Sequence, residues 1–242
     1  MPPSFTYFLD FVKDGGKKHS YAASIGSCDI PKDTKDTAVK YLGEFSSINV
    51  REVQAQQFIN EQLDTDRAKV VVDPTLLLTK DEWQTFVKKD ELCGYIVVYM
   101  IDFKKEVFDF IRTLSKTTGC KVVYVHDAIR SQSGMINSRD DTVEDFITMI
   151  SNAEYVVTGS FHALCMSLKL EKQFYYTLSS TGNRNSRLEN LIDIAGLSYR
   201  RVIDGKCDGA KIDYSEVTPR LENHVNKSKD IIDKLLNDIQ KQ

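Results

Sequence analysis

The chain has 242 residues, with 35 acidic and 32 basic side chains, a formal net charge of −3 and a pI near 5.9. Hydrophobic residues make up 41% and charged residues 28%, which is the balance of an ordinary globular protein and excludes collagen, low-complexity disorder and a disulfide scaffold. A protein that coats nucleic acid carries a basic surplus, so we expect no nucleic-acid partner.

Targeting features point to the cytoplasm. The five cysteines are odd in number and form no CxxC pair, which favours free thiols in a reducing compartment. The longest apolar run, Tyr95–Ile101, is far shorter than the roughly 20 residues of a membrane span. The N-terminus lacks a basic region before its apolar stretch, and Asp10 interrupts that stretch, so we predict no signal peptide. We expect a cytoplasmic protein that can still act at the inner membrane face through a partner or a lipid-linked substrate.

Short β-rich runs alternate with amphipathic helical patterns along the chain. The expected strands are Thr6–Val12, Ser20–Ile25, Ser47–Val50, Lys69–Val72, Tyr95–Ile101, Lys121–Val125, Tyr155–Thr158, Gln173–Thr177 and Tyr199–Ile203. Several of them are continuous apolar runs, such as YIVVYM and VVYV, which are typical of strands buried on both faces of a parallel sheet.

Helix signals fall between these runs. Thr79 and Glu82 form a capping-box pattern that opens one helix, and Ser186 and Glu189 form another. Gly196 follows the second pattern at the place where a helix commonly ends in the left-handed conformation. Strand–helix alternation of this kind predicts an α/β fold with a mostly parallel sheet.

The pattern divides into three parts. Residues 1–92 contain few complete strand–helix units and are expected to be the C-terminal part of a first Rossmann-like domain. Residues 93–205 contain about four units and are expected to form a complete second Rossmann-like domain. Residues 206–242 predict a long amphipathic helix that packs on the body, because apolar residues recur at helical spacing after Thr218.

Ligands of open α/β sheets bind beyond the carboxyl ends of the strands, where helix N-termini favour anions. Arg51 falls where an expected strand ends and a helix begins, so its guanidinium could grip a carboxylate or phosphate. A surface ion pair of Arg51 with Glu52 or Glu44 explains the same position equally well.

The segment Tyr155–Ala163 contains the strongest candidate. A buried strand turns through Thr158 and Ser160 into a helix, and His162 lies in the first helical turn. Histidine is the side chain best suited to proton transfer near neutral pH. A core histidine bonded to a backbone carbonyl is the alternative; the clustering of polar residues at the strand end favours function.

Two further strand ends carry polar side chains. Asn185 and Arg187 stand where a strand passes into a capped helix, and a solvated loop is the alternative explanation. His126 and Asp127 follow the VVYV strand, where they could contact a sugar or merely finish the strand. Asp73 precedes a proline and is expected to turn the chain. The sequence lacks a Walker loop, GxGxxG, GxSxG and any metal-ligand spacing, so we expect no metal and no cofactor.

Taken in order, these motifs resemble the polysaccharide pyruvyl transferase family. The resemblance runs to about residue 205, and the order and spacing of the motifs together are specific although no single motif is decisive. The segments that carry it are Tyr21–Gly26, Ser47–Glu52, Val72–Leu78 with Trp83, Val157–Ala163 and Asn185–Arg187.

The resemblance implies a GT-B-like fold, with Rossmann-type parallel sheets, an incomplete first domain and a complete second one. It implies transfer of pyruvate from phosphoenolpyruvate to two hydroxyls of a sugar or lipid-linked oligosaccharide, which gives a pyruvate ketal on a surface polysaccharide. His162 matches the family's catalytic histidine and Arg51 its donor-binding arginine. Ser160 and Arg187 are further donor-binding candidates. The candidates for the acceptor are His126, Asp127 and Asn185.

Two alternatives stay open. A GT-B glycosyltransferase would use a nucleotide sugar, with Glu189 or Asp193 on the donor ribose. A non-catalytic or split subunit would pair with a further copy or a partner chain that replaces the N-terminal segment usual in the family.

Overall fold

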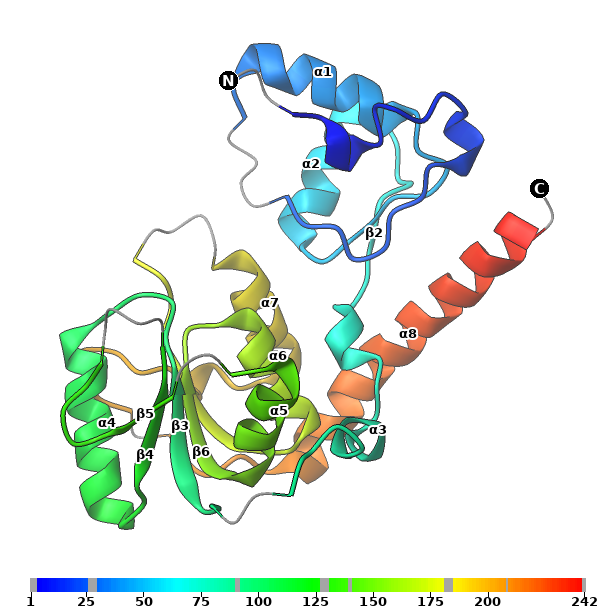
Figure 1. Ribbon diagram of the computed structural model, residues 1–242. Helices are drawn as coiled ribbons and strands as arrows, with labels where there is room; N and C mark the ends of the chain where they lie inside the picture. Colours follow the sequence, from blue (N-terminus) through cyan, green and yellow to red (C-terminus); the bar gives the residue numbers. More distant parts are fainter. Residues whose placement is uncertain are drawn as a thin grey trace. The chain divides into compact units, whose positions relative to one another are not determined.

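The computed structural model describes residues 4–25, 30–89, 92–126, 131–138, 141–180, 185–207 and 209–240. The chain forms two compact units (Figure 1). Unit 1 comprises Met1–Leu77 and Arg220–Gln242, and unit 2 comprises Leu78–Pro219. The sequence-based domain limits at residues 92 and 205 remain predictions.

Unit 2 is built on a five-stranded sheet in which every pair of neighbours is parallel. The strand order is β5-β4-β3-β6-β7. The strands are β3 (Tyr95–Tyr99), β4 (Val122–Val125), β5 (Ile136–Ser138), β6 (Ala153–Thr158) and β7 (Gln173–Tyr176). The residues Ile96, Val97 and Val98 of β3 have no exposed surface, as expected for a central strand covered on both faces.

Helices connect these strands and cover the sheet. They are α3 (Lys80–Gln84), α4 (Lys105–Thr118), α5 (Val143–Asn152), α6 (Phe161–Lys169) and α7 (Ser186–Ala195). The chain passes from β3 to β4 in one direction and from β6 to β7 in the other. Right-handed crossovers therefore place α4 and α6 on opposite faces of the sheet.

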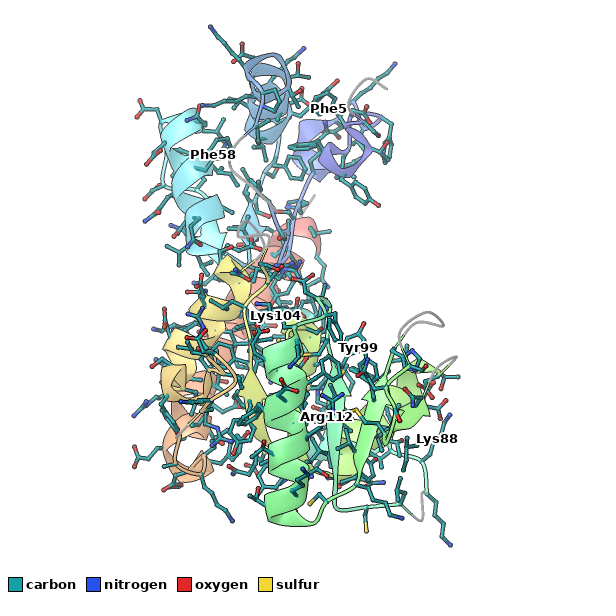
Figure 2. All side chains as sticks on the ribbon, turned by 90° about the vertical axis from the view of Figure 1, so that its left-hand side faces the viewer. Phe5, Phe58, Lys88, Tyr99, Lys104 and Arg112 are labelled. Atoms are coloured by element: carbon teal, nitrogen blue, oxygen red, sulfur yellow. The ribbon has the colours of Figure 1, made fainter. Side chains whose placement is uncertain are left out.

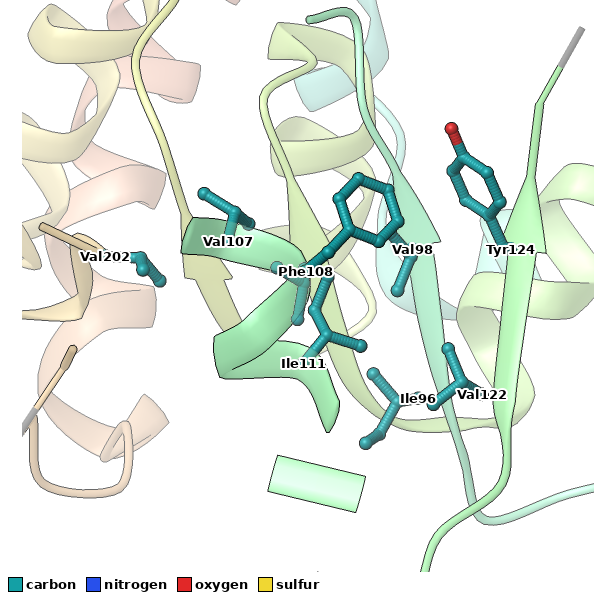
Figure 3. Packing of buried hydrophobic residues seen from close by; sticks show 9 residues of the cluster. Ile96, Val98, Val107, Phe108, Ile111, Val122, Tyr124 and Val202 are labelled. Carbon is teal, nitrogen blue, oxygen red and sulfur yellow. The ribbon is translucent and has the colours of Figure 1, made fainter. Parts of the chain in front are cut away.

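Figure 3 shows how α4 packs on its face. Phe108 and Ile111 of α4 are fully buried against Ile96 and Val98 of β3. The ring of Phe108 also meets Tyr124 edge-on, with the centroids 5.2 Å apart. Burying side chains of this size contributes roughly 1.5–3 kcal/mol each, so this cluster is a main source of stability in unit 2.

Unit 1 holds a smaller sheet. Its strands β1 (Asn49–Val50) and β2 (Lys69–Val70) pair in parallel. Its helices α1 (Lys32–Gly43) and α2 (Val53–Leu63) precede and follow β1. A buried apolar cluster joins the two helices to the sheet: Leu42, Phe45, Ile48, Val50, Ala55, Ile59 and Ala68. Figure 2 labels Phe58 and Phe5 in this unit and Tyr99, Lys104 and Arg112 in unit 2.

The last helix, α8 (Tyr214–Gln240), contributes to both units. It contains Pro219, and the division between the units falls directly after this residue. In unit 1 the hydroxyl of Ser228 accepts a hydrogen bond of 3.0 Å from the backbone N–H of Val72. The predicted helix within residues 206–242 is present and begins at Tyr214. No helix within the described ranges is both long and apolar enough to cross a membrane.

Some expected elements are wrong. Thr6–Phe8 forms a 3-10 helix (η1) instead of a strand, and Ser20–Ile25 forms a single isolated bridge, from Ala23 to Val50, instead of a strand. Ser198–Arg200 is also a 3-10 helix (η5). The short edge strand β5 was not predicted, because its three residues are polar or exposed and lack an apolar run.

Candidate active site

A buried hydroxyl holds the turn at the end of β6. Thr158 is fully buried, and its Oγ1 donates a hydrogen bond of 2.7 Å to the backbone oxygen of Tyr99 in β3. The same Oγ1 accepts a bond of 2.9 Å from the backbone N–H of Ser160. The turn between β6 and α6 is therefore fixed to the neighbouring strand.

Ser160 is the N-cap of α6. Its hydroxyl accepts a hydrogen bond from the backbone N–H of Ala163, at 3.5 Å. The remaining N–H groups of the first turn and the helix dipole make this end of α6 favourable to negative charge. Only 6% of Ser160 is exposed, so the cap is shielded from solvent.

His162 is the second residue of α6 and is exposed, in the first helical turn that the sequence predicts. Its ring meets Phe161 edge-on, with the centroids 5.5 Å apart. The guanidinium carbon of Arg187, in the first turn of α7, lies 5.5 Å from the centroid of the same Phe161 ring. One aromatic ring therefore contacts both of these sequence-predicted residues.

A cavity of about 520 Å³ opens beside the start of α6. Its described lining consists of Tyr99, Val125, His126, Asp141, Thr142, Val143, Phe146, Ser160, His162 and Met166. Three predicted site residues, His126, Ser160 and His162, thus share one cavity. Arg187 is not part of its lining. The volume lies within the range of small-molecule sites, roughly 300–1,000 Å³.

His126 is half-buried directly after β4. Its backbone N–H donates to the oxygen of Ser138, at 3.1 Å, and its ring stacks on Tyr124 with centroids 4.9 Å apart. Strand pairing and stacking together fix the ring at the cavity wall. Asp127, its predicted companion, lies outside the described residues.

The start of α5 also lines the cavity, with Thr142, Val143 and Phe146, and was not among the predicted site residues. Thr142 and Asp145 form a complete capping box there. Lys88 pairs with Asp145 at 2.7 Å. That ion pair and the hydrogen bonds from Thr142 lower the pKa of Asp145 to about 2. The Thr-x-x-Asp spacing could have predicted this helix start, since aspartate can replace the usual glutamate in a capping box.

The side chain of Asn185 forms hydrogen bonds with the backbone that follows β7. Its Oδ1 accepts from the N–H of Ser179, at 2.7 Å, and its Nδ2 donates to the oxygen of Ser179, at 3.0 Å. Asp102, after β3, accepts hydrogen bonds from the hydroxyl of Ser179 and the N–H of Ser180. The predicted capping box of Ser186 and Glu189 is wrong, since Asn185 is the N-cap and no side chain caps α7. Asp102 and Asn185 together fix the strand end that precedes Arg187.

Arg51 follows β1 in unit 1 and forms an ion pair with Asp73, which follows β2. The arginine side chain is 16% exposed and the aspartate side chain 3%. The other carboxylate oxygen of Asp73 accepts bonds from the N–H and hydroxyl of Thr75, at 3.0 and 2.8 Å. The sequence analysis weighed Glu44 as a partner of Arg51, and Glu44 pairs instead with Lys18.

The Asp73 carboxylate is kept ionised by its neighbours. Burial alone would raise its pKa, but the hydrogen bonds from Thr75 and Arg51 hold the pKa below its ordinary value of 3.8. Burial, together with the charge of Asp73, raises the pKa of Tyr21 to about 12. The expectation that Asp73 turns the chain is confirmed, because its side chain caps the 3-10 helix Pro74–Leu76 (η3).

Within the described residues, no three His, Cys, Asp or Glu side chains gather in a way that could hold a metal ion. In unit 2 the polar groups around the start of α6 include the hydroxyls of Thr158 and Ser160, the imidazoles of His126 and His162 and the guanidinium of Arg187. Such a set can bind carboxylate, phosphate and sugar hydroxyls and can transfer a proton.

Comparison with known proteins gives one family. A family model described as polysaccharide pyruvyl transferase matches residues 2–180. The comparison with curated proteins gave no significant match.

Solved structures resemble the chain in fold. A Methanocaldococcus jannaschii UDP-GlcNAc 2-epimerase in complex with UDP-GlcNAc and UDP has a TM-score of 0.50 and 15% identity, over 91% of this chain and 68% of that one. A second structure of the epimerase from that organism has a TM-score of 0.51 and 13% identity, over 86% and 63%. A putative UDP-N-acetylglucosamine 2-epimerase from Listeria monocytogenes has a TM-score of 0.48 and 12% identity, over 85% and 55%.

The likeness concerns the fold alone, because the identities are low. It confirms the predicted α/β, GT-B-like fold with Rossmann-type parallel sheets. This chain spans between 55% and 68% of the length of these solved proteins.

Proposed function

The chain belongs to the polysaccharide pyruvyl transferase family, and from this premise we propose that it transfers pyruvate from phosphoenolpyruvate to a pair of hydroxyls on a sugar. The acceptor is a sugar or a lipid-linked oligosaccharide, and the product is a pyruvate ketal of a surface polysaccharide or its precursor. The proposed transfer needs neither a metal nor a further cofactor.

The observation that carries the proposal is the start of α6. Ser160 caps this helix at the wall of the cavity, and His162 stands two residues further on in the same wall. An anionic donor is favoured by the helix N-terminus, and a proton donor lies beside it. Phosphoenolpyruvate needs both, because it carries a carboxylate and a phosphate and reacts by protonation at carbon.

In the proposed reaction, His162 gives a proton to the methylene carbon C3 of the donor while the first sugar hydroxyl attacks C2. The proton of that hydroxyl returns to the histidine. The second hydroxyl then adds to C2 as the C2–O bond to phosphate breaks, and its proton leaves with the phosphate. The new methyl group and two C–O bonds account for every atom of the donor and acceptor.

The other predicted residues take binding roles in this proposal. Arg51 is proposed to bind the donor anion, because a guanidinium group binds carboxylate and phosphate in two-pronged fashion. Arg187 and Ser160 are further donor-binding candidates. The Asp73 carboxylate would orient Arg51 in this role. His126, Asp127 and Asn185 are proposed for the acceptor.

Calorimetric titration with phosphoenolpyruvate tests the proposal. We expect binding by the wild type, loss of most binding in Arg51→Ala and Arg51→Lys, and little change in Arg201→Ala, which removes an exposed arginine elsewhere. The Arg51→Lys variant matters because it keeps a charge opposite Asp73. It therefore separates lost donor binding from unfolding of unit 1.

The histidine is tested separately. His162→Gln should keep much of the donor binding and abolish phosphate release with a sugar acceptor, whereas His224→Gln on α8 should change neither. Binding of UDP in place of phosphoenolpyruvate would favour the nucleotide-sugar alternative. A chain that binds neither ligand would favour the non-catalytic subunit.

A further inference from the structure

Unit 1 contains a cavity that the proposed transfer does not use. Its volume is about 750 Å³. The described lining consists of His19, Ser46, Ser47, Asn49, Arg67, Lys69, Ile231, Lys234, Leu235 and Asp238. Ser47 precedes β1 and Arg67 precedes β2, so the cavity lies at the amino ends of the strands. Arg51 and Asp73 stand at the opposite, carboxyl ends.

The charges that line this cavity are unbalanced. Arg67, Lys69 and Lys234 contribute three cations, and Asp238 contributes the single carboxylate. None of the ion pairs found among the described residues involves these three cations. The charge of the cavity is therefore opposite in sign to the net charge of the whole chain, which is −3.

Two of these cations are held in place by the backbone. A guanidinium nitrogen of Arg67 donates to the oxygen of Phe45, at 3.1 Å, and the ammonium of Lys69 donates to the oxygen of Asp66, at 2.7 Å. Carbonyl oxygens orient the two groups without neutralising them. Their positive charge is therefore preserved toward the cavity.

The face of the small sheet that lines the cavity is polar. Alternate residues of a strand point to opposite faces, and Ile48 and Val50 belong to the apolar cluster beneath α1 and α2. Ser47 and Asn49 line the cavity instead, with the Ser47 hydroxyl 3.0 Å from Nδ1 of His19. A sheet face that packs against a helix is usually apolar. Because this face is polar, it is suited to a polar ligand.

We propose that this cavity binds a phosphorylated small molecule. Three cations opposite one carboxylate suit a dianion, and the hydroxyls of Ser46 and Ser47 suit the hydroxyls of a sugar-sized ligand. Ile231 and Leu235 on α8 supply an apolar wall against which such a ligand would pack. The volume is ample for a molecule of this size.

Calorimetry with glucose 1-phosphate and inorganic pyrophosphate tests the site on the full chain. We expect both to bind, and glucose without phosphate not to bind. Lys234→Gln and Arg67→Gln should each weaken binding about tenfold, which corresponds to about 1.4 kcal/mol. Lys229→Gln is the matched control, because Lys229 lies on the same helix, is exposed and does not line the cavity. Since Arg67 also bonds to Phe45, Lys234→Gln keeps the test valid if Arg67→Gln fails to fold.

Several outcomes would overturn the proposal. Absence of binding at millimolar concentration would do so, and so would an equal loss in Lys229→Gln, which would indicate unspecific charge attraction. Loss in Arg51→Ala without loss in Lys234→Gln would place the anion in the donor site. Retention on phosphatidylglycerol vesicles without binding of either soluble phosphate would assign the cations to a membrane surface. The titration with phosphoenolpyruvate can fail while this one succeeds, so the two proposals are tested apart.

Discussion

The two units differ in how they hold their polar groups. In unit 1 the Arg51 charge is matched by the carboxylate of Asp73, which is itself saturated by Thr75. In unit 2 the backbone is fixed by hydroxyls, and His162 is left exposed at a capped helix start. The comparison shows two ways to fix polar groups after a strand, one by an ion pair between side chains and one by hydroxyls bonded to the backbone.

Their cores differ as well. The central strand of unit 2 has five residues and is almost wholly buried, whereas β1 and β2 have two residues each. Trp83, the single tryptophan, belongs to unit 2, so its fluorescence reports on that unit while circular dichroism reports on both. Each of the following substitutions uses this difference.

The largest effect is expected from Phe108→Ala in the core of unit 2. Removing a fully buried phenylalanine leaves a cavity beside Tyr124 and should lower the free energy of unfolding by about 3–5 kcal/mol. Urea denaturation followed by Trp83 fluorescence measures it. Phe11→Ala, at a residue that is 67% exposed in unit 1, should change stability by less than about 0.5 kcal/mol. Similar effects of the two substitutions would contradict the assigned burial.

Asp73→Asn should destabilise unit 1 by about 2–3 kcal/mol. Removing one partner of a buried pair costs roughly 3–5 kcal/mol, and the partial exposure of Arg51 reduces this figure. We expect the circular dichroism transition to shift while the Trp83 transition stays in place. A joint shift of both would show that the units unfold together.

The same residue predicts a dependence on pH. Because the folded-state pKa of Asp73 is below its ordinary value of 3.8, its stabilisation is fully present above about pH 4. That stabilisation is lost as the pH falls through the lower, folded-state pKa. Unfolding measured between neutral and acid pH should therefore show a component in the wild type that Asp73→Asn lacks. An identical slope in both proteins would argue against a lowered pKa.

Thr158→Val should lower the stability of unit 2 by about 2 kcal/mol, because it leaves the Ser160 N–H without its buried acceptor and removes one of the donors to the Tyr99 oxygen. Thr158→Ser keeps the hydroxyl and should change stability less. Fluorescence-monitored denaturation compares the two. Equal losses would assign the effect to the methyl group.

The smallest effect is expected from Ser160→Ala. Loss of the N-cap bond to Ala163 should lower the stability by about 1 kcal/mol. Ser160→Asp restores an acceptor and should recover most of that stability, yet its charge should weaken phosphoenolpyruvate binding. Recovery of both would contradict an anion site at this helix end.

Much of unit 2 could be predicted from the sequence. The apolar runs of β3 and β4, the Thr79 and Glu82 capping box and the Gly196 helix end are all confirmed. These signals are local, because burial on both faces and capping each leave a pattern within a few residues.

Unit 1 was less predictable. Thr6–Phe8 has the aromatic content of a strand but forms a single helical turn, which ends at Leu9 in the left-handed conformation. The partner of Arg51 is 22 residues away, and only the parallel pairing of β1 and β2 brings Asp73 beside it. The link from Asp102 to Ser179 depends on sheet order in the same way. Contacts that depend on the order of strands in a sheet cannot be predicted from the spacing of residues that are close in the sequence.

The turn after β6 sets a rule for reading related sequences. The Thr158 oxygen both donates and accepts, and among the side chains that fit a buried strand end only threonine and serine do this. Valine has nearly the same shape but neither function. A related chain with serine at this position can retain the turn that presents its histidine, whereas one with valine or alanine has lost the means to hold it. This single position can therefore sort sequences by whether the helix start remains intact.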